Sequence, residues 1–338
     1  MEYPIDFVVT WLDSSDPSWQ KEYAKYKGEE TKGDQSESRF RDWDLFRYWF
    51  RAVEAYAPWV NKVFLVTNGK IPDWINENHP KLVLVKHDDY IPKQFLPTFN
   101  SCTIELHMNK IEGLSEHFVY FNDDSFINAP ITPEYYFKKC LPCDCNEESI
   151  LNVPVWDKDY KYGIYHSMLT DIGVINAHFK RWSTVRNSLR RWLGPHLGFR
   201  GILLSLYLFR QNRFIGFKWR HFEQPFLKSV FEEAWEKAKV NLEDSCTRFR
   251  QEVILNPYFF RYWQFATNRF YPSKRKGFSL RLKSGNKNII ISSMNNPKVK
   301  SLCLNDTPYC THNEYLKLKP IIKAAFDKKF PAKSSFEI

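Results

Sequence analysis

Short apolar runs alternate with amphipathic segments through the first 125 residues. Four runs have the length and the β-branched or aromatic character of buried strands. They cover residues 5–11, 63–67, 82–86 and 118–122. Between them, helical spacing of apolar residues predicts helices over residues 42–57, 74–78 and 100–111. Because strands that alternate with helices build a parallel sheet covered on both faces, we predict an α/β fold with a mostly parallel, doubly wound, Rossmann-like sheet.

The second half of the chain changes character. Residues 157–219 are basic and aromatic, and they predict a helical lobe. An amphipathic segment of this kind can lie on an anionic membrane surface. The simpler interpretation is a lobe that packs on the sheet and leaves its arginines in solvent. Further elements are predicted after the lobe: a helix over residues 224–238, strands over 288–292 and 299–304 that return to the sheet, and a helix over 313–330.

These elements predict a single domain over residues 1–338. Its α/β core comprises residues 1–156 and 220–312, interrupted by the basic lobe. The helix over residues 313–330 closes the domain, and we expect a disordered tail after Pro331.

Composition and charge narrow the function. The 338 residues are 43% hydrophobic and 17% aromatic, which suits a globular protein with a large core and excludes a disordered chain or a coiled coil. A net charge of +10 predicts attraction to an anion, and nucleic acid, a phosphorylated substrate and an acidic membrane surface all qualify. The arginines and aromatics form no known nucleic-acid recognition motif, so we expect no nucleic-acid partner.

The sequence shows no targeting or membrane-spanning segment. Residues 1–13 lack the basic and apolar regions of a secretory signal, and no apolar run reaches the roughly 18–20 residues that a membrane span needs. We therefore expect a cytoplasmic protein. A peripheral position at the inner face of the cell membrane is compatible with this expectation. Cys140, Cys143 and Cys145 could suggest zinc, but no second matching pair exists, so free reduced thiols are the better interpretation.

Two acidic clusters follow predicted strands. Asp123 and Asp124 come directly after the strand at residues 118–122, and Asp306 follows the strand at 299–304. Adjacent carboxylates repel each other unless a cation compensates, and hard divalent metals prefer oxygen ligands. A capped turn explains a lone pair of aspartates equally well. The second cluster favours a metal site held by Asp123 and Asp306.

Arginines would have to hold any phosphate, because the chain has no glycine-rich phosphate loop and no other familiar catalytic motif. Forked guanidinium groups suit this role, although a single arginine is more often part of a surface ion pair. The candidates are Arg39, Arg41, Arg248 and Arg250. His221 opens a helix expected over residues 222–238, and an imidazole that is kept neutral near a helix N-terminus can act as a general base. Alternatively, His221 packs against or caps the helix.

The chain resembles the Stealth family of hexose-1-phosphoryltransferases in four blocks, in the family's order and over roughly half of its length. The first block is similar to IDFVVTWLDSSDP (residues 5–17). The second is similar to SRFRDWDLFRYWFRAVEAYAPWVNKVFLVTNGKIPDWI (38–75), LPTFNSCTIE (96–105) and GLSEHFVYFNDDSF (113–126). The third resembles HFEQPFLKSVFEEAWEKAKVNLEDSCTRFRQE (221–252), and the last CLND (303–306). The chain departs from the family at Ser14, often Gly, and at Asn68, often Asp.

This resemblance implies a reaction. Stealth proteins are similar to the catalytic core of the lysosomal N-acetylglucosamine-1-phosphotransferase, and bacterial members build phosphodiester-linked capsules and other surface polysaccharides. A UDP-sugar, here with N-acetylhexosamine favoured, gives up sugar-1-phosphate to a hydroxyl of a polysaccharide or lipid-linked oligosaccharide, and UMP leaves. The chemistry calls for Mg²⁺ or Mn²⁺, cations around the phosphoryl group and a base. The alternative is an ordinary glycosyltransferase that transfers only the sugar.

The resemblance also implies roles for individual residues. His221, Arg250, Asp123 and Asp124 match catalytic positions, and Asp306 matches the last acidic position. The remaining matches are expected to bind substrate. They are Trp11, Asp13, Asp16, Arg39, Arg41, Asn100, Ser101 and Arg248.

Overall fold

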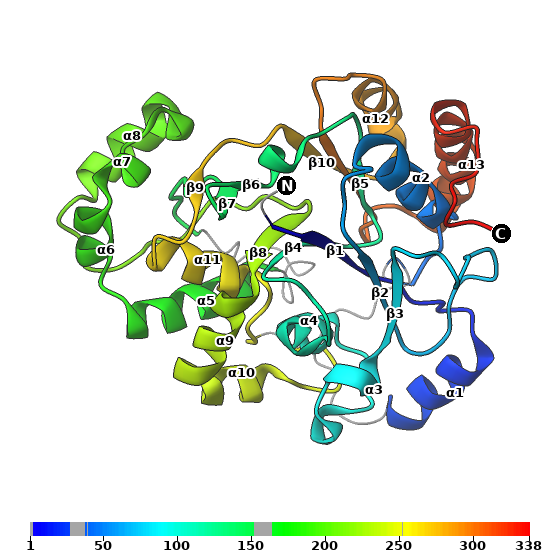
Figure 1. Cartoon of the computed structure of the whole chain (residues 1–338), viewed down its shortest axis with the longest axis horizontal. Coiled ribbons are helices and arrows are strands. Elements are labelled where there is room, and N and C mark those ends of the chain that lie inside the picture. Colours follow the sequence, from blue (N-terminus) through cyan, green and yellow to red (C-terminus); the bar gives the residue numbers. More distant parts are fainter. Residues whose placement is uncertain (1–2, 28–37, 39, 152–163, 252) are drawn as a thin grey trace.

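The central sheet contains the four strands predicted in the first part of the chain (Figure 1). The computed structural model describes residues 3–27, 38, 40–151, 164–251 and 253–338. Four strands run parallel to one another: β3 (Leu82–Lys86), β2 (Val63–Thr67), β1 (Ile5–Thr10) and β4 (His117–Phe121). The antiparallel strand β8 (Gln224–Leu227) lies beside β4 at the edge. The predicted mostly parallel α/β sheet is confirmed.

Helices cover both faces of this sheet. Successive side chains of a strand point to opposite faces, and here the apolar side chains on both faces are buried by helices. On one face, Trp49 of α2 (Phe46–Tyr56) packs against Phe7 and Phe121. On the other face, Phe118 packs against Phe231 of α9 (Lys228–Lys237). The helices of the core are α1 (Pro17–Tyr26), α2 (Phe46–Tyr56), α3 (His87–Tyr90), α4 (Ser101–Leu106), α9 (Lys228–Lys237), α10 (Lys239–Ser245) and α11 (Tyr258–Ala266).

A second sheet adjoins the first. Its strands are β10 (Gly277–Arg281), β11 (Ser301–Asn305) and β5 (Ser125–Ile127), with β11 parallel to β10 and antiparallel to β5. Phe326 of the closing helix packs on Phe126 of β5. The helices beside this sheet are α12 (Lys287–Met294) and α13 (His312–Lys329). A third, small sheet consists of β6 (Phe137–Lys138), β7 (Leu141–Asp144) and β9 (Tyr271–Pro272).

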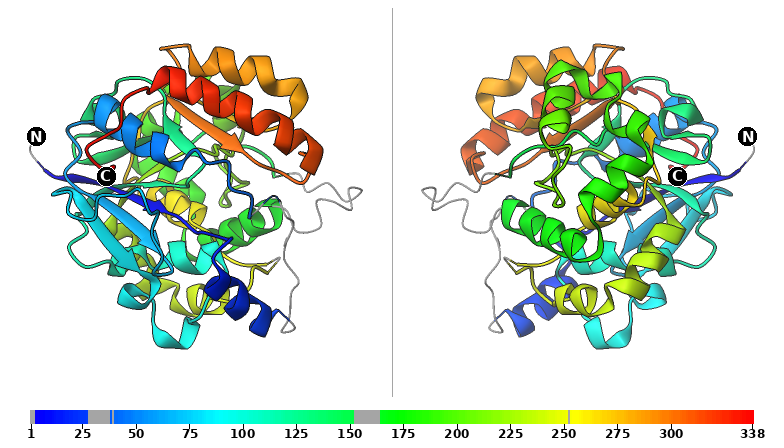
Figure 2. Two further views of the ribbon diagram at one scale, coloured as in Figure 1. Left: turned by 90° about the vertical axis from the view of Figure 1, so that its right-hand side faces the viewer. Right: turned by 90° about the vertical axis from the view of Figure 1, so that its left-hand side faces the viewer.

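The described part of the predicted basic lobe is helical. Helices α6 (Arg181–Asn187), α7 (Leu189–Trp192) and α8 (Gly198–Tyr207) lie at one end of the molecule, and α5 (Ile164–His178) leads into them (Figures 1 and 2). The lobe is attached by a fully buried ion pair in which Arg181 binds Glu148 with two hydrogen bonds of 2.7 and 2.6 Å. Among the described residues, no helix is both long and apolar enough to cross a bilayer.

Two predicted elements were wrong, and a third was assigned to the wrong sheet. Residues 288–292 belong to helix α12, where Ile290 and Met294 are buried one helical turn apart; a short apolar run does not by itself distinguish strand from helix. The strand at residues 299–304 exists as β11 but belongs to the second sheet. Residues 74–78 form turns instead of a helix, and Ile75 makes a β-bridge with Glu337.

The helix predicted over residues 224–238 begins later than expected. Gln224–Leu227 is strand β8, and α9 starts at Lys228. The alternation of Gln224 and Phe226 fits a strand that pairs with β4, whereas the helical pattern begins after it. His221 therefore lies before an edge strand, and the expected influence of a helix N-terminus on its imidazole does not apply.

The C-terminal tail is packed, in contrast to the predicted disorder. Phe336 is buried against Phe50, and Glu337 accepts two hydrogen bonds, of 2.7 and 2.8 Å, from the buried Arg51 of α2. The same Arg51 donates to the carbonyl of Phe330 at 2.8 Å. The tail thus fixes α13 against α2.

Short 3-10 turns complete the fold: η2 (Lys93–Phe95), η3 (Met108–Lys110), η4 (Pro133–Tyr135), η6 (Pro195–Leu197) and η7 (Ser284–Asn286).

Removing one partner of the Arg51–Glu337 pair should destabilise the fold. We expect Glu337→Ala to lower the free energy of unfolding by about 3–5 kcal/mol, because it leaves a buried guanidinium without its counter-charge. Ile338→Ala, at the exposed neighbouring residue, should change it little. Urea denaturation measures both variants. Equal small effects would show that the tail does not contribute to the stability of the core.

Candidate functional site

The turn at residues 122–124 lies where the chain passes from the first sheet to the second. Strand β4 ends at Phe121 and β5 begins at Ser125. Strand β11 runs antiparallel to β5, with Cys303 opposite Ser125, and the Leu304 amide donates to the carbonyl of Asp124 at 2.9 Å. The two acidic segments that follow β4 and β11 are therefore neighbours in the structure.

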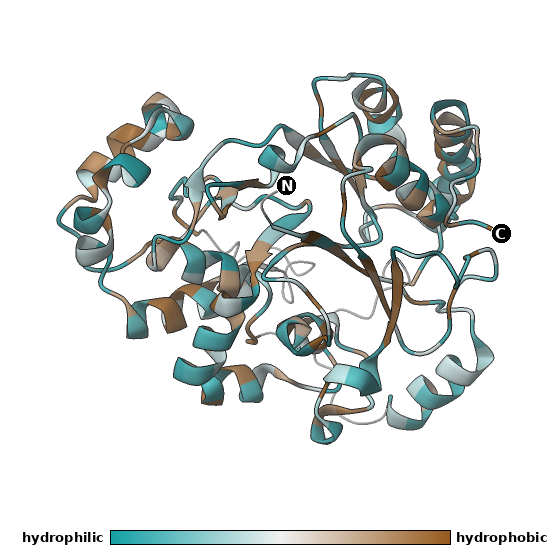
Figure 3. Ribbon diagram, viewed as in Figure 1, coloured by the Kyte–Doolittle hydropathy of each residue, from teal (hydrophilic) through white to brown (hydrophobic). Residues whose placement is uncertain are grey.

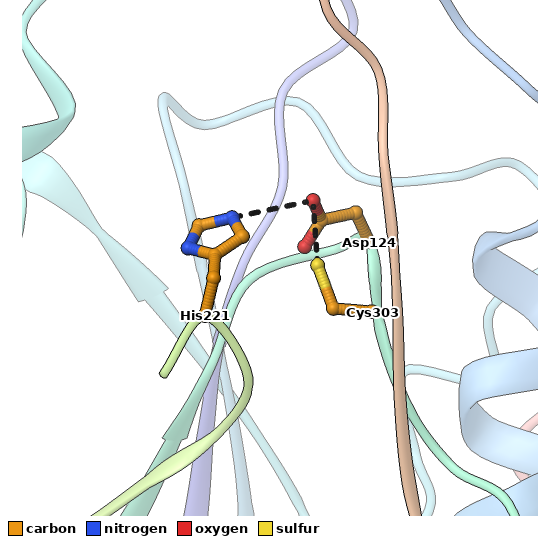
Figure 4. Close-up of side chains that lie close together, drawn as sticks. All are labelled: Asp124, His221 and Cys303. Carbon is orange, nitrogen blue, oxygen red and sulfur yellow. Dashed lines mark hydrogen bonds and ion pairs between the residues drawn. The ribbon is translucent and has the colours of Figure 1, made fainter. Parts of the chain in front are cut away.

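Three side chains with metal-binding atoms meet at this turn (Figure 4). Oδ2 of Asp124 lies 3.4 Å from Sγ of Cys303 and 3.8 Å from Nε2 of His221. Across the described residues this is the one group of three or more such side chains whose ligand atoms all lie within 4.8 Å of one another. Asp124 and His221 are partly open to solvent, whereas Cys303 is buried. The sequence analysis did not identify Cys303, although it stands in the CLND block.

Asp123 has the most perturbed acidity in this turn. Protein atoms crowd around its carboxyl although the residue remains accessible to solvent, and the charges of Asp124 and Asp42 add repulsion. These causes, burial first, raise the pKa of Asp123 to about 7. A nearby divalent cation would relieve both the repulsion and the poor solvation. The oxygen donors of Asp123 and Asp124 therefore fit a Mg²⁺ or Mn²⁺ ion.

The position of His221 depends on a buried polar network two residues further on. Oε1 of Glu223 accepts hydrogen bonds from Tyr136 at 3.2 Å and from Ser301 of β11, and Arg275 lies 3.3 Å from it. The His221 ring also packs beside Trp219, with ring centroids 5.2 Å apart. The network joins the segment before β8 to β11, so it holds His221 in front of Asp124.

Asp306 is held by two cationic or polar donors. Its Oδ2 accepts a hydrogen bond of 3.0 Å from the indole of Trp43 and lies 3.5 Å from the guanidinium of Arg41. Arg41 also donates to the carbonyl of Cys310 at 2.7 Å. Arg41 is therefore engaged with the acidic segment after β11. The expectation for Arg39 concerns a position outside the described residues.

The predicted phosphate-binding residues of the third block meet those of the second. Arg250 donates to Ser101 Oγ at 2.9 Å, and Nε of Arg248 donates to the carbonyl of Pro97 at 3.3 Å. Asn100 is the N-cap residue of α4 and donates to Thr247 at 3.1 Å. Arg248, Arg250, Asn100 and Ser101 thus form one cluster at the start of α4.

A chain of hydrogen bonds connects this cluster to the acidic turn. The Tyr120 hydroxyl lies 2.8 Å from Glu105 of α4 and 2.6 Å from Asn122 of the turn. Thr10, at the end of β1, lies 3.3 Å from the same hydroxyl. The carboxyl ends of β1 and β4 and the helix α4 are therefore linked, at the edge of the sheet where parallel α/β proteins bind ligands.

The residues of the first block have clear structural roles. Asp16 is the N-cap of α1 and accepts from the Trp19 amide at 3.1 Å. Lys70 lies 3.0 Å from Asp13 and 3.8 Å from Asp16. Although burial opposes the shift, hydrogen bonds from Ser15 and the Lys70 ammonium lower the pKa of Asp13. Sequence reasoning missed Lys70, which neutralises this pair of carboxylates.

Trp11 and the cysteines are the remaining candidates from the sequence. Trp11 stacks on Phe46 with ring centroids 5.9 Å apart, and it remains partly exposed. None of the seven cysteines forms a disulfide, and Cys140, Cys143 and Cys145 do not come together as a metal-binding group among the described residues. Burial raises the pKa of Cys143 to about 11, so this thiol stays protonated.

Comparisons with known proteins give the same family over the full chain. A model of the Stealth protein conserved region 2 matches residues 39–142. The capsular polysaccharide phosphotransferase WcwK of Streptococcus pneumoniae is 40% identical, with 98% of each chain covered. The receptor polysaccharide phosphotransferase WefC of Streptococcus oralis is 37% identical, with 99% of each covered.

Two further matches extend the comparison. The exopolysaccharide phosphotransferase cps2G of Lactiplantibacillus plantarum is 36% identical over 99% of this chain and 96% of that protein. A crystal structure of the galactosyltransferase LgtC with donor and acceptor sugar analogs matches with 8% identity and a TM-score of 0.41, and 98% of each chain is covered.

The raised pKa of Asp123 predicts how stability depends on pH without metal. An unfolded Asp loses its proton near pH 4, whereas the folded one keeps it to about pH 7. The folded state therefore binds more protons between these values, and this carboxyl increasingly destabilises it as pH rises from 4 to 7.

In EDTA, Asp123→Asn should thus raise the melting temperature relative to the unmodified protein, with a gap that opens between pH 4 and 7 and stays constant above. Because Asp123 is exposed, solvent screening reduces the effect well below what the pKa shift alone would give, and we expect a gap of roughly 2 °C at pH 8. Asp244→Asn, on the exposed side of α10, is the matched control. Scanning calorimetry measures the gap, and a pH-independent gap would contradict the perturbed acidity of Asp123.

Proposed function

Because the chain belongs to the Stealth family, whose relatives of similar length are named polysaccharide phosphotransferases, we propose that it moves sugar-1-phosphate onto a growing surface polysaccharide. The protein is an enzyme of the phosphotransferase class. In finer terms, the donor is a UDP-sugar, with N-acetylhexosamine favoured, and the acceptor is a sugar hydroxyl of a polysaccharide or lipid-linked oligosaccharide. The observation that carries the proposal is the acidic turn with His221 in front of it.

The reaction forms one bond and breaks one bond at phosphorus. The acceptor hydroxyl oxygen attacks the phosphorus that carries the sugar, and the bond from this phosphorus to the bridging oxygen breaks. UMP leaves with the electron pair of that bond. We assign the hydroxyl proton to His221, which is partly open to solvent beside Asp124.

The acidic turn supports a divalent metal. We propose that Asp123 and Asp306, which lie outside the group of Asp124, His221 and Cys303, hold Mg²⁺ or Mn²⁺. The pairing of β11 with β5, which makes the two acidic segments neighbours, supports this assignment. When bound, the ion neutralises the pyrophosphate and the leaving phosphate. Asp124 also lies within 3.8 Å of His221, so its carboxylate can orient the imidazole.

The cluster at the start of α4 supports phosphate binding. Arg250 and Arg248 carry positive charge, and we propose that Arg250 neutralises the transferred phosphoryl group while Arg248, Asn100 and Ser101 help to bind the donor. Trp11 offers a partly exposed ring for a base or sugar. Asp13 and Asp16 shape the loop after β1 through Lys70, and Arg41 acts through Asp306.

We propose that the whole chain is one catalytic domain and that it works in the cytoplasm, where nucleotide sugars are made, at the inner face of the cell membrane. The division into an α/β core over residues 1–156 and 220–312 and a lobe over 157–219 is part of this proposal. Arg39 stays a predicted donor-binding residue of the same domain.

The nucleotide released separates this function from its rival. With a panel of UDP-sugars and acceptor oligosaccharides, we expect UMP and a phosphodiester signal in phosphorus NMR, and both should disappear in EDTA and return with Mg²⁺ or Mn²⁺. Release of UDP without a new phosphodiester would show an ordinary glycosyltransferase. Undiminished transfer in EDTA would contradict the metal assignment.

His221 and Arg250 should have separable effects. His221→Ala should lower turnover about 10²–10⁴-fold and remove the acidic limb of the pH profile, because a base must be deprotonated to act. Arg250→Ala should lower turnover about 10²–10³-fold. His312→Ala, on the exposed start of α13, controls for a general effect of losing a histidine. If His221→Ala weakens only donor affinity and leaves the pH profile unchanged, His221 binds substrate and is not the base.

A further inference from the structure

The net positive charge of the chain comes from one segment. The whole sequence holds 49 Lys and Arg against 39 Asp and Glu. Residues 172–222 contain ten of these basic residues and no acidic residue, so the rest of the chain has equal numbers of both and is neutral. Glu147 and Glu148 pair with Arg181, Lys218 and Arg220 at the base of the lobe. The exposed arginines further out leave this end of the molecule positive.

Helix α8 in this segment has an apolar face that points into solvent. Its exposed side chains stand at i, i+4, i+7 and i+8, which is one face of a helix. They are Phe199 (77% exposed), Leu203 (50%), Leu206 (51%) and Tyr207 (83%). Figure 3 shows the hydrophobic residues along α8 at the outer end of the molecule.

The opposite face of α8 is the one that packs on the protein. Gly201, Ser205 and Leu208 are buried, and they are also spaced at i, i+4 and i+7. A Cβ added to Gly201 would lie 3.7 Å from Glu147, which shows how closely the helix approaches the segment after β7. The small residues therefore face inward and the large apolar ones outward. This pattern is the reverse of an ordinary surface helix, whose apolar stripe faces the core.

Arginines border the apolar face. Arg200 and Arg210 are exposed on either side of it along the chain, and Arg190 and the exposed Leu189 of α7 lie nearby in sequence. We propose that α7 and α8 form a docking surface for an anionic lipid bilayer, with Phe199, Leu203, Leu206 and Tyr207 in the headgroup boundary and the arginines on the lipid phosphates. Aromatic and basic side chains around an apolar stripe are typical of helices that lie in a membrane interface.

The charge around α8 favours a membrane, and not a second copy of this chain, as the partner that binds its apolar face. A symmetric dimer through α8 would bring two basic surfaces together, and like charges repel. A bilayer rich in phosphatidylglycerol presents the opposite charge and accepts apolar side chains. The inference does not depend on the proposed reaction, since docking is measured without donor or acceptor.

Vesicle flotation of the full chain tests the proposal. We expect binding to phosphatidylglycerol vesicles that weakens as salt rises from about 50 to 500 mM, and at least tenfold weaker binding to phosphatidylcholine vesicles. The double variant Phe199→Ser/Leu203→Ser should weaken binding about tenfold or more. Arg200→Ala/Arg210→Ala should weaken it about 30-fold at low salt.

The matched control changes exposed apolar residues of another basic helix. Leu316→Ser/Ile321→Ser on α13 should leave binding unchanged. All of these residues are exposed, so circular dichroism and melting temperature should stay the same. Binding that the control lowers as much as the α8 variant, or equal binding to both lipids, would overturn the proposal. So would a dimer in sedimentation that only Phe199→Ser/Leu203→Ser dissociates, since the face would then join two copies of the chain.

Discussion

The turn that carries the chain from the first sheet into the second is the constraint on which the candidate site depends. Because β4 and β5 belong to different sheets, the three residues between them must change direction in the space between those sheets. The antiparallel pairing of β5 with β11 then fixes Cys303 and the segment with Asp306 beside Asp124. Asp124 and Cys303, which are 179 positions apart in sequence, are thereby brought next to each other by backbone hydrogen bonds.

Charge is distributed in three zones around this turn. Burial and the neighbouring charge of Asp124 raise the pKa of Asp123, and a bound cation would offset both effects. Arg248 and Arg250 stand at α4, connected to the turn through Glu105 and Tyr120. The arginines of α7 and α8 form a third zone at one end of the molecule. An anionic donor, a divalent metal and an anionic surface can each be attracted to a different zone.

The sequence predicted the first sheet well because its strands are continuous buried runs bounded by turn residues. It failed where an apolar run had two solutions, as in α12, and where an edge strand preceded a helix, as in β8. The acidic residues and His221 were found from motifs. Cys303, Lys70 and the Glu223 network were missed, because their importance comes from contacts between distant segments that no local pattern reveals.

The central claim is that the acidic turn between the two sheets holds the metal of the reaction. Anomalous diffraction from crystals grown with Mn²⁺ and uridine diphosphate tests it most directly. The account predicts a manganese peak within about 2.5 Å of carboxylate oxygens of Asp123 or Asp306, in contact with the pyrophosphate. An ordered manganese peak on Asp13 and Asp16, with none at the turn, would contradict it.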